Sequence, residues 1–532
     1  MNKNLRPRLR RFLLGVGAGA VAMSISLVIR LYFGGLFLPE VAVGALVTNT
    51  PGSVESVLVT NLQYLAKYSA LTVAVVINLL LYGALASILS SVSGRKEYGD
   101  RVSIYTFAAY GVLFILTIVA LEFTAVLSSP QPLSTVVLTL LPPQLAYGIV
   151  LVAGERYAPL QTGVICEPLK PIGRQGSGGK NKKKFDRKRR LVIQAGVATA
   201  VAGVLLYYGV GLLFPKPGIS RVDAVSALQQ QEVTLTANFY RVDVNIFPPN
   251  VSSSGWTLPI TGLVSNPLTL NYDQLLAMES QEQYNTLECV SNDTDGDLIS
   301  TGKFTGVKFS DLLAQAGVKP EATYVVFKAT DGYSVGIPMA KAMDQGTILA
   351  YQINGQPLPA EHGFPARMIV PGYYGMMNCK WVTSIELVAE TYQGYWQVRG
   401  WINEAQYETG SFIVTPGNAQ VADRFGIAGA SNVPIGLTPI AGVAFAGDRG
   451  IDKVEVSTDG GNTWTLASVQ DPLSGYTWVL WTADWNPPAT GNYSIAVRST
   501  DGTGAVQTAV MATPFPGGAT GYAVVDVGVS SS

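Results

Sequence analysis

Five apolar stretches in the first two-fifths of the chain constrain its fold more than any other feature. They lie at residues 12–36, 68–92, 102–126, 134–154 and 191–214. Each is close to or above the roughly 20 residues that a helix needs to cross a bilayer. The fourth is the weakest, because Pro142 and Pro143 interrupt it and proline removes a helical hydrogen bond. We therefore expect residues 1–215 to form an α-helical transmembrane bundle of about five helices.

The distribution of charge predicts how this bundle is oriented. Residues 1–215 hold 21 Lys and Arg against 8 Asp and Glu, whereas residues 216–532 hold 15 against 28. Basic clusters precede the first stretch, separate the second from the third, and fill a basic loop at 171–190 before the fifth. Short basic loops stay in the cytoplasm, so five spans place everything after about Phe214 outside it. A four-span count would reverse part of this topology.

The basic loop at 171–190 is rich in Gly and Lys and ends in "RKRR". We interpret it as a solvated linker that fixes the topology, with binding of acidic membrane lipid as the alternative. The text "RRLVIQ" at 189–194 resembles a twin-arginine export signal. Such a route carries proteins that have already folded around a cofactor.

The chain contains a single histidine, His362, and it lies after the apolar stretches. The predicted helices therefore cannot supply the ligands of a bis-histidine haem. Two charges fall inside the predicted spans. Arg30 ends the first span and can extend its guanidinium to the interface, whereas Glu122 in the third is a candidate for handling protons or quinone.

After residue 215 the pattern changes to short strands with a few helices. Runs such as "TYVVFKATDGYSVGIP" and "FSDLLAQAG" predict a mixed α+β domain over residues 216–410. From residue 411 the helix signals disappear, and alternating runs such as "GNYSIAVRSTDG" predict a β-sandwich over residues 411–532. Four tryptophans are its expected core aromatics: Trp464, Trp478, Trp481 and Trp485.

Cys289, in "TLECVSND", raises the question of chemistry. Together with Cys379 it lies on the side predicted to be outside the cytoplasm, and an oxidising compartment favours a disulfide between them. An inert buried thiol, a metal thiolate and a nucleophile paired with His362 are the alternatives. The spacing of the residues leaves all four open, although no cluster of cysteine and histidine predicts zinc.

Residues 238–401 resemble the molybdopterin-binding domain of the sulfite oxidase family. The resemblance rests on "NFYRV", "TLECVSND", "DGYSVGIPMAKAM" and the highly specific stretch from Leu349 to Trp381, in the family's order. Residues 411–510 resemble the immunoglobulin-like domain that follows it there, through "GIDKVEVSTDGGNTW". The resemblance implies a multi-domain chain: a transmembrane bundle, an α+β molybdopterin domain and an immunoglobulin-like β-sandwich.

The same resemblance implies a set of site residues. Cys289 would be the molybdenum ligand, and a soft thiolate suits that role. The implied cofactor-binding residues are Asn238, Tyr240, Arg241, His362, Arg367, Asn378, Cys379 and Lys380, with Cys379 acting mainly through its backbone. Tyr333 matches a family tyrosine near the oxo ligand and is, with Cys289, a candidate catalytic residue. A solvated charge at Lys380, loop capping by His362 and sheet packing of Tyr333 are the structural alternatives.

The implied reaction is two-electron oxygen-atom transfer on a small S-oxo or N-oxo compound, with a molybdenum cofactor. Sulfite oxidases place arginine soon after the ligand cysteine, whereas this chain has Asp293 and Thr294 there, followed by Asp295 and Asp297. Carboxylates oppose an anion, so a neutral or cationic substrate gains weight, with Arg241 as one compensating charge.

Animal sulfite oxidase carries a haem domain in the same chain, and this chain has no histidine to spare for a haem. We expect electrons to pass to or from a separate redox protein or the quinone pool.

A non-catalytic cell-surface binding or structural protein that has kept the fold is the alternative function. Cys289 together with Arg367 and Lys380 favours the enzyme, because a scaffold has no physical need for a metal thiolate and a phosphate clamp. The β-sandwich is an expected homodimer surface, and nothing in the chain predicts a nucleic-acid partner.

Overall fold

The computed structural model of the protein describes residues 5–33, 35–54, 64–92, 97–124, 133–157, 226, 228–230, 232–245, 247–417, 422 and 431–531. The described residues belong to one compact unit. The predicted fifth span, the basic loop and the twin-arginine segment lie outside the described residues.

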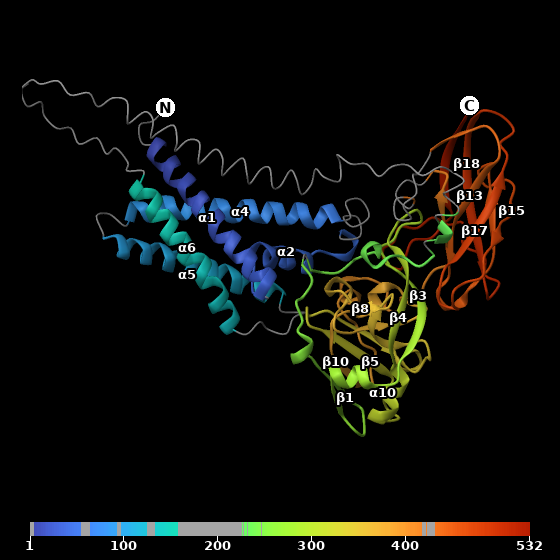
Figure 1. Cartoon of the computed structure of the whole chain (residues 1–532), viewed down its shortest axis with the longest axis horizontal. Helices are drawn as coiled ribbons and strands as arrows, with labels where there is room; N and C mark the ends of the chain where they lie inside the picture. The colour runs from blue at the N-terminus through green and yellow to red at the C-terminus, as the bar shows by residue number, and fades with distance from the viewer. Residues whose placement is uncertain are drawn as a thin grey trace, which may run out of the picture. The chain divides into compact units, whose positions relative to one another are not determined.

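Four long helices follow the first four apolar stretches (Figure 1). They are α1 (Leu5–Phe33), α4 (Tyr64–Val92), α5 (Tyr98–Thr124) and α6 (Leu133–Tyr157). Within the described residues these four are long and apolar enough to cross a membrane. Helix α6 continues through Pro142 and Pro143, so the two prolines do not end the fourth stretch. The short apolar helix α2 (Leu38–Thr48) is an addition that hydropathy did not predict, because 11 residues cannot span a bilayer.

The helices pack closely where small residues face one another. A Cβ added at Gly15 of α1 would collide with the Cβ of Ala86 on α4, and such small contacts are typical of membrane helix pairs. Arg30, at the end of α1, forms an ion pair with Glu40 of α2, with Nε 2.7 Å from Oε2. The side chain of Glu122 lies outside the described residues.

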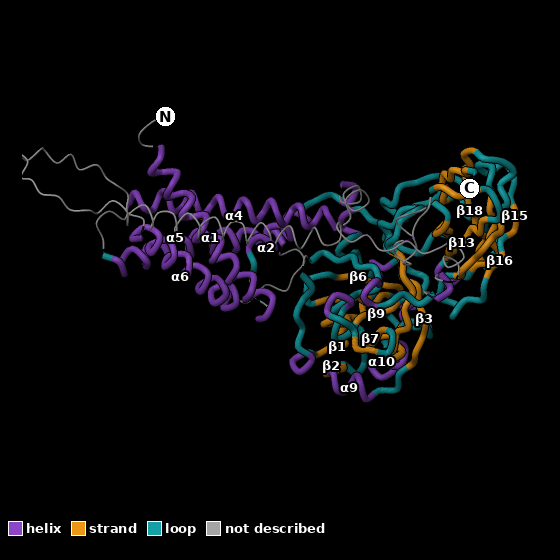
Figure 2. The backbone as a smooth tube through the Cα atoms, turned by 45° about the horizontal axis from the view of Figure 1, so that its top comes forward, coloured by secondary structure: helices purple, strands orange, loops and turns teal. Residues whose placement is uncertain are grey.

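The described part of the α+β region contains two sheets, with short α-helices between their strands (Figure 2). The first sheet has the order β2 (Leu268–Asn271), β1 (Thr257–Gly262), β10 (Val382–Val388), β5 (Tyr324–Ala329), β6 (Ser334–Pro338). The second has the order β3 (Gln281–Glu288), β4 (Ile299–Lys308), β7 (Ile348–Ile353), β8 (Gln356–Pro357), with β9 (Arg367–Ile369) also on β7. The helices are α9 (Tyr272–Ala277), α10 (Phe309–Ala316) and α11 (Met339–Ala342).

Apolar residues of both sheets and of α10 enter one core, including Phe309, Phe327 and Leu349. Short 3-10 turns connect the strands: η1 (Thr236–Asn238), η2 (Ser253–Gly255), η3 (Ala360–His362), η4 (Gly375–Met377) and η5 (Gln397–Arg399). The mixed pattern agrees with the α+β expectation.

The C-terminal region is rich in strands and forms two further sheets. One has the order β11 (Gly410–Thr415), β13 (Thr438–Phe445), β17 (Val479–Trp485), β16 (Ser468–Val469). The other has the order β12 (Asn432–Pro434), β19 (Ala523–Ser530), β18 (Gly491–Asp501), β14 (Ile451–Ser457), β15 (Thr465–Leu466), and the turn η6 (Gly447–Arg449) precedes β14. The two sheets share a core that includes Ile440, Trp481 and Val497. An immunoglobulin-like identity for this β-rich region stays a prediction.

Three of the four predicted core tryptophans are buried: Trp478, Trp481 and Trp485. The prediction is wrong for Trp464, which is only half-buried and lies beneath the Arg498 guanidinium, 4.2 Å from ring centroid to Cζ. Because Trp464 sits in the β14–β15 turn rather than on an inward-facing strand position, solvent reaches one side of its ring.

Candidate active site

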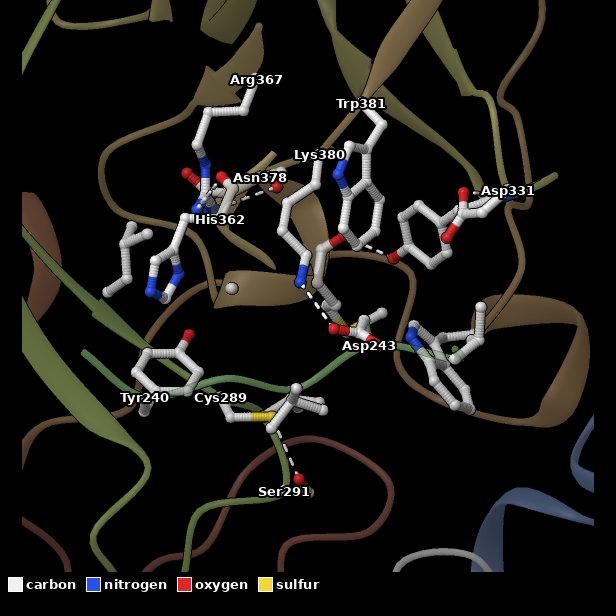
Figure 3. Close-up of a pocket in the computed structure, with 18 of the residues that line it drawn as sticks. Tyr240, Asp243, Cys289, Ser291, Asp331, His362, Arg367, Asn378, Lys380 and Trp381 are labelled. Carbon is white, nitrogen blue, oxygen red and sulfur yellow. Dashed lines mark hydrogen bonds and ion pairs between the residues drawn. The ribbon is translucent and has the colours of Figure 1, made fainter. Parts of the chain in front are cut away.

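A buried cavity in the α+β region brings together most of the predicted site residues (Figure 3). The predicted residues that line it are Tyr240, Cys289, Tyr333, His362, Arg367, Asn378 and Lys380. They come from segments up to 140 residues apart in the sequence, so only the fold unites them. We call this space the active-site cavity.

Three predicted cofactor-binding residues do not line the active-site cavity. Asn238 is exposed at the end of η1. Arg241 instead pairs with Asp243, with Nε 2.8 Å from Oδ2. Cys379 is buried in the hydrophobic core, and burial raises the pKa of its thiol. Their assignment as cofactor contacts stays a prediction.

Cys289 is the first residue after β3, and three hydrogen bonds hold the loop that it begins. Its backbone N–H donates to the carbonyl of Leu298 at 2.9 Å, which closes the loop between β3 and β4. Asn292 then locks the loop: its Nδ2 donates to Glu288 Oε1 at 2.9 Å, and its Oδ1 accepts the Leu298 N–H at 2.8 Å. The backbone that carries the thiol is thus held by its own N–H and by the Asn292 side chain.

The outer edge of β3 is held by the segment that precedes β17. Thr286 N–H donates to the carbonyl of Tyr476 at 3.0 Å, and Trp478 N–H donates to Thr286 Oγ1 at 2.8 Å. Ser474 Oγ also donates to the carbonyl of Tyr284 at 2.6 Å. The strand that presents Cys289 is therefore clamped on both sides, since β4 pairs with its other edge.

The thiol of Cys289 faces the active-site cavity, with the Oγ of Ser291 3.0 Å away (Figure 3). In the described part of the chain, Cys289 and Cys379 are not joined by a disulfide. The expectation of a disulfide is therefore wrong, because the fold directs Cys289 into the cavity and Cys379 into the core. The metal-thiolate alternative keeps its support.

Three nitrogen-bearing side chains face the thiol across the cavity. Arg367, at the start of β9, is only 5% exposed. Lys380 donates to Asp243 Oδ2 at 3.1 Å and stacks on the Trp381 ring at 4.4 Å. Burial, together with the nearby Arg367 charge, lowers the pKa of Lys380 to about 8 and that of His362 to about 3. His362 is therefore neutral near pH 7, with Nε2 3.2 Å from the Thr236 carbonyl.

Asn378 and Tyr333 are occupied by protein contacts in this structure. The Asn378 amide accepts from Val370 N–H at 2.7 Å and donates to the carbonyls of Tyr373 and Tyr374, both at 3.2 Å. Tyr333 donates its hydroxyl proton to the Met376 carbonyl at 2.6 Å. Asn378 shapes the loop that carries Lys380, and Tyr333 lines the cavity with its hydroxyl already engaged.

Several side chains that sequence reasoning did not single out also line the active-site cavity. Chief among them are Asp243, Ser291, Asp331, Trp381, Trp396 and Trp401. Asp331 is half-buried, and its partial removal from water raises the pKa of its carboxyl. Asp331 reads as an ordinary turn residue in "TDGY", and Asp243 as a surface charge.

The acidic residues after Cys289 do not line the active-site cavity. Asp293 and Thr294 face a different, small cavity, whose wall includes Glu408 and Ser411. The loop turns at Asn292, whose N–H donates to the Cys289 carbonyl and whose Oδ1 accepts the Leu298 N–H. This turn directs the side chains of Asp293 and Thr294 away from the thiol. The charge argument against sulfite that rests on Asp293 therefore has no support in this geometry.

The cavity fits a molybdenum–pterin cofactor by two independent features. Among the described residues, the buried Nε of Arg367 has no hydrogen-bond partner, as expected for a donor that awaits an anionic or polar ligand. Gly375 lies so close beneath Tyr240 that a Cβ there would collide with the tyrosine hydroxyl. A soft thiolate facing buried cations suits a metal bound to a phosphate-bearing pterin, and the missing side chain at Gly375 leaves room for Tyr240 in the cavity wall.

Comparison with known proteins supports this interpretation. Residues 245–396 match the oxidoreductase molybdopterin binding domain, and residues 399–517 match the Mo-co oxidoreductase dimerisation domain. Mitochondrial sulfite oxidase of Rattus norvegicus is 31% identical over 277 residues, which cover 45% of this chain and 51% of the relative. The uncharacterized oxidoreductase YuiH of Bacillus subtilis is 31% identical over 167 residues, which cover 31% of this chain and 82% of that protein.

Among solved structures, the sulfane dehydrogenase SoxCD of Paracoccus pantotrophus aligns with a TM-score of 0.46 and 26% identity, over 52% of this chain and 74% of that one. The chain spans about half the length of the mitochondrial sulfite oxidases that it matches. On the two matched domains and on the relatives found by sequence, the chain belongs to the sulfite oxidase family of molybdenum cofactor-dependent oxidoreductases.

Proposed function

We propose that this protein is a membrane-anchored oxidoreductase whose catalytic domain lies outside the cytoplasm. It carries out two-electron oxygen-atom transfer on a small S-oxo or N-oxo compound. The observation that carries the proposal is the convergence of the Cys289 thiol with Arg367 and Lys380 in one buried cavity. The four apolar helices and the charge asymmetry support the membrane anchor and its orientation.

The bound cofactor supplies the oxygen-atom transfer and the redox change. Cys289 is the residue that holds the metal, and the Ser291 hydroxyl at 3.0 Å can donate a hydrogen bond to its thiolate. Arg367 and Lys380 hold the anionic part of the cofactor, and neutral His362 contributes a hydrogen-bonding ring nitrogen. Tryptophans Trp381, Trp396 and Trp401 line the cavity and limit access of water to the reacting centre.

The charges in the cavity leave the substrate class broad. Asp243 is neutralised by Arg241 and Lys380, at 2.8 and 3.1 Å. Asp331 is half-buried, and its raised pKa favours the neutral acid more than usual. The aromatic walls suit a small neutral sulfur compound, and the cations do not forbid sulfite. The matched dimerisation domain supports a homodimer through the C-terminal region, and electrons are exchanged with a separate redox protein or quinone.

The experiment is a substrate panel on the full chain loaded with molybdenum cofactor. Sulfite, thioethers, sulfoxides and N-oxides are supplied with an artificial electron carrier, and molybdenum content is measured in parallel. We expect stoichiometric molybdenum and turnover of at least one sulfur compound, with turnover lost in Cys289→Ser. Well-folded protein that binds no molybdenum would instead favour the non-catalytic surface protein.

A further inference from the structure

A second cavity, of about 720 Å³, lies where the membrane helices meet the α+β region, and the function proposed above leaves it unused. We call it the interfacial cavity. Its membrane side is formed by the C-terminal ends of α1 and α5, by α2 and by the short connection before α2, through Arg30, Leu36, Phe37, Glu40 and Leu121. The topology expected from the basic clusters places both helix ends at the outer face of the membrane.

A fixed ion pair forms part of the wall of the interfacial cavity. The side chains of Arg30 and Glu40 are each only 14% exposed. Both also bind the backbone of Phe247: Arg30 Nη2 donates to its carbonyl at 3.3 Å, and Glu40 Oε1 accepts its N–H at 3.4 Å. Charges near membrane depth are costly and are commonly retained for function. This pair adds charged atoms to a wall in which apolar side chains such as Leu36 and Phe37 alternate with polar ones such as Thr257 and Thr330.

The interfacial cavity and the active-site cavity share wall residues. Val244 and Asp331 line both. Asp331 is held by Asn245 Nδ2 at 2.7 Å and by the N–H of Tyr333 at 3.1 Å. Tyr395 lines the interfacial cavity, and its ring centroid lies 5.7 Å from that of Tyr333, which lines the active-site cavity. The same side chains thus separate the two spaces.

A redox enzyme must exchange electrons with a partner that binds close to its active site, and the interfacial cavity is separated from the active-site cavity only by shared wall residues. The one histidine of the chain cannot supply both axial ligands of a bis-histidine haem. A membrane quinone combines a flat ring, two carbonyl oxygens and an apolar tail. Leu36, Phe37 and Leu121 offer apolar surface for the ring and tail, whereas the hydroxyl groups of Thr257 and Thr330 line the same cavity and can donate to the oxygens.

We propose that the interfacial cavity binds the head group of a membrane quinone, which exchanges electrons directly with the active site. The proposal rests on the function proposed above and makes the partner specific. In the oxidising direction, a sulfur compound, water and quinone give the S-oxide and quinol. The sulfur gains the oxygen of water and loses two electrons, and the two protons of that water end on the quinone oxygens. Asp331, in the shared wall, is placed to pass those protons.

The test uses the full chain in lipid nanodiscs without molybdenum cofactor, so that binding is measured apart from turnover. The probe is 2-heptyl-4-hydroxyquinoline N-oxide, a fluorescent quinone analogue, displaced by ubiquinone-1. Gly44→Leu adds a side chain to α2 at a position that lines the interfacial cavity. Ala42→Leu makes a similar addition on an exposed position of the same helix and is the matched control. Thr330→Leu fills the cavity from the α+β side.

We expect saturable binding to the wild type and to Ala42→Leu, and affinity at least about tenfold weaker in Gly44→Leu and Thr330→Leu. When loaded with cofactor, Gly44→Leu should keep its turnover with a soluble artificial acceptor but lose quinone reduction. Equal binding by all four proteins, or none by the wild type, would overturn the quinone site while turnover with the artificial acceptor leaves the proposed function standing. Specific binding without any turnover would support the site and contradict the proposed function.

Discussion

Replacement of Arg367 by methionine should separate the stability of the empty protein from its hold on the cofactor. The guanidinium is 5% exposed, and burial lowers its pKa from 12.5 to about 10. That difference corresponds to about 3 kcal/mol of free energy spent on keeping the charge in an empty cavity. Against it stand two long hydrogen bonds, to the carbonyls of His362 at 3.2 Å and Asn378 at 3.4 Å, of about 1 kcal/mol each.

The cofactor-free Arg367→Met protein should therefore unfold with an unchanged free energy, or one raised by about 1 kcal/mol. The same substitution should weaken the binding of the cofactor. Loss of a charge-assisted contact of about 1.5 to 3 kcal/mol weakens binding roughly 10- to 100-fold. The assay is denaturant unfolding of protein made in a host without molybdenum cofactor, and molybdenum content after dialysis of loaded protein.

Arg498→Met is the matched control, because this arginine lies on the C-terminal region and pairs with Glu455 at 3.1 Å. It should lose at most about 1 kcal/mol of stability and no molybdenum. If Arg367→Met instead destabilised the empty protein by several kcal/mol and retained molybdenum normally, Arg367 would be a structural residue and the cradle argument would be wrong.

Three further outcomes follow from burial and contacts. Burial holds the pKa of His362 at about 3 in the folded protein, against 6.5 in the unfolded chain. As the pH falls, the unfolded chain therefore takes up the proton first, so the free energy of unfolding is full above pH 6.5 and falls by about 2 kcal/mol between pH 6.5 and 5. Denaturant titrations at several pH values should show this slope, and His362→Gln should flatten it. Trp478→Ala should cost about 4 kcal/mol of unfolding free energy, since the ring is fully buried, whereas Trp464→Ala on a half-buried ring should cost clearly less in the same titration. Cys379→Ala should keep its molybdenum, because the Cys379 side chain lies in the core and not in the active-site cavity; loss of metal would make its thiol a ligand.

Sequence reasoning succeeded where one local rule governs the outcome. Helices α1, α4, α5 and α6 follow from the length and hydropathy that a bilayer demands. The α2 helix was not predicted, because a segment of 11 residues between two spans is too short to cross a bilayer, and hydropathy alone does not say whether it is a helix or a loop. Its cavity and its ion pair depend on contacts with residues more than 200 positions away.

The active site shows the same division. Strand pairing and turns bring Cys289, Arg367 and Lys380 together, and their spacing in the sequence does not predict this. Only the resemblance to the family predicted that they belong to one site. The neighbourhood of Cys289 in sequence was misleading for Asp293, because a single turn at Asn292 redirects the chain. Local sequence predicts elements, whereas the walls of a cavity are decided by long-range packing.

The central claim is that Cys289 binds molybdenum, and X-ray absorption at the molybdenum edge tests it most directly. The spectrum of loaded wild-type protein should show the dithiolene sulfurs of the pterin together with one protein sulfur, and Cys289→Ser should show one sulfur ligand fewer. An identical number of sulfur ligands in the two proteins, or no molybdenum in well-folded wild type, would contradict the account.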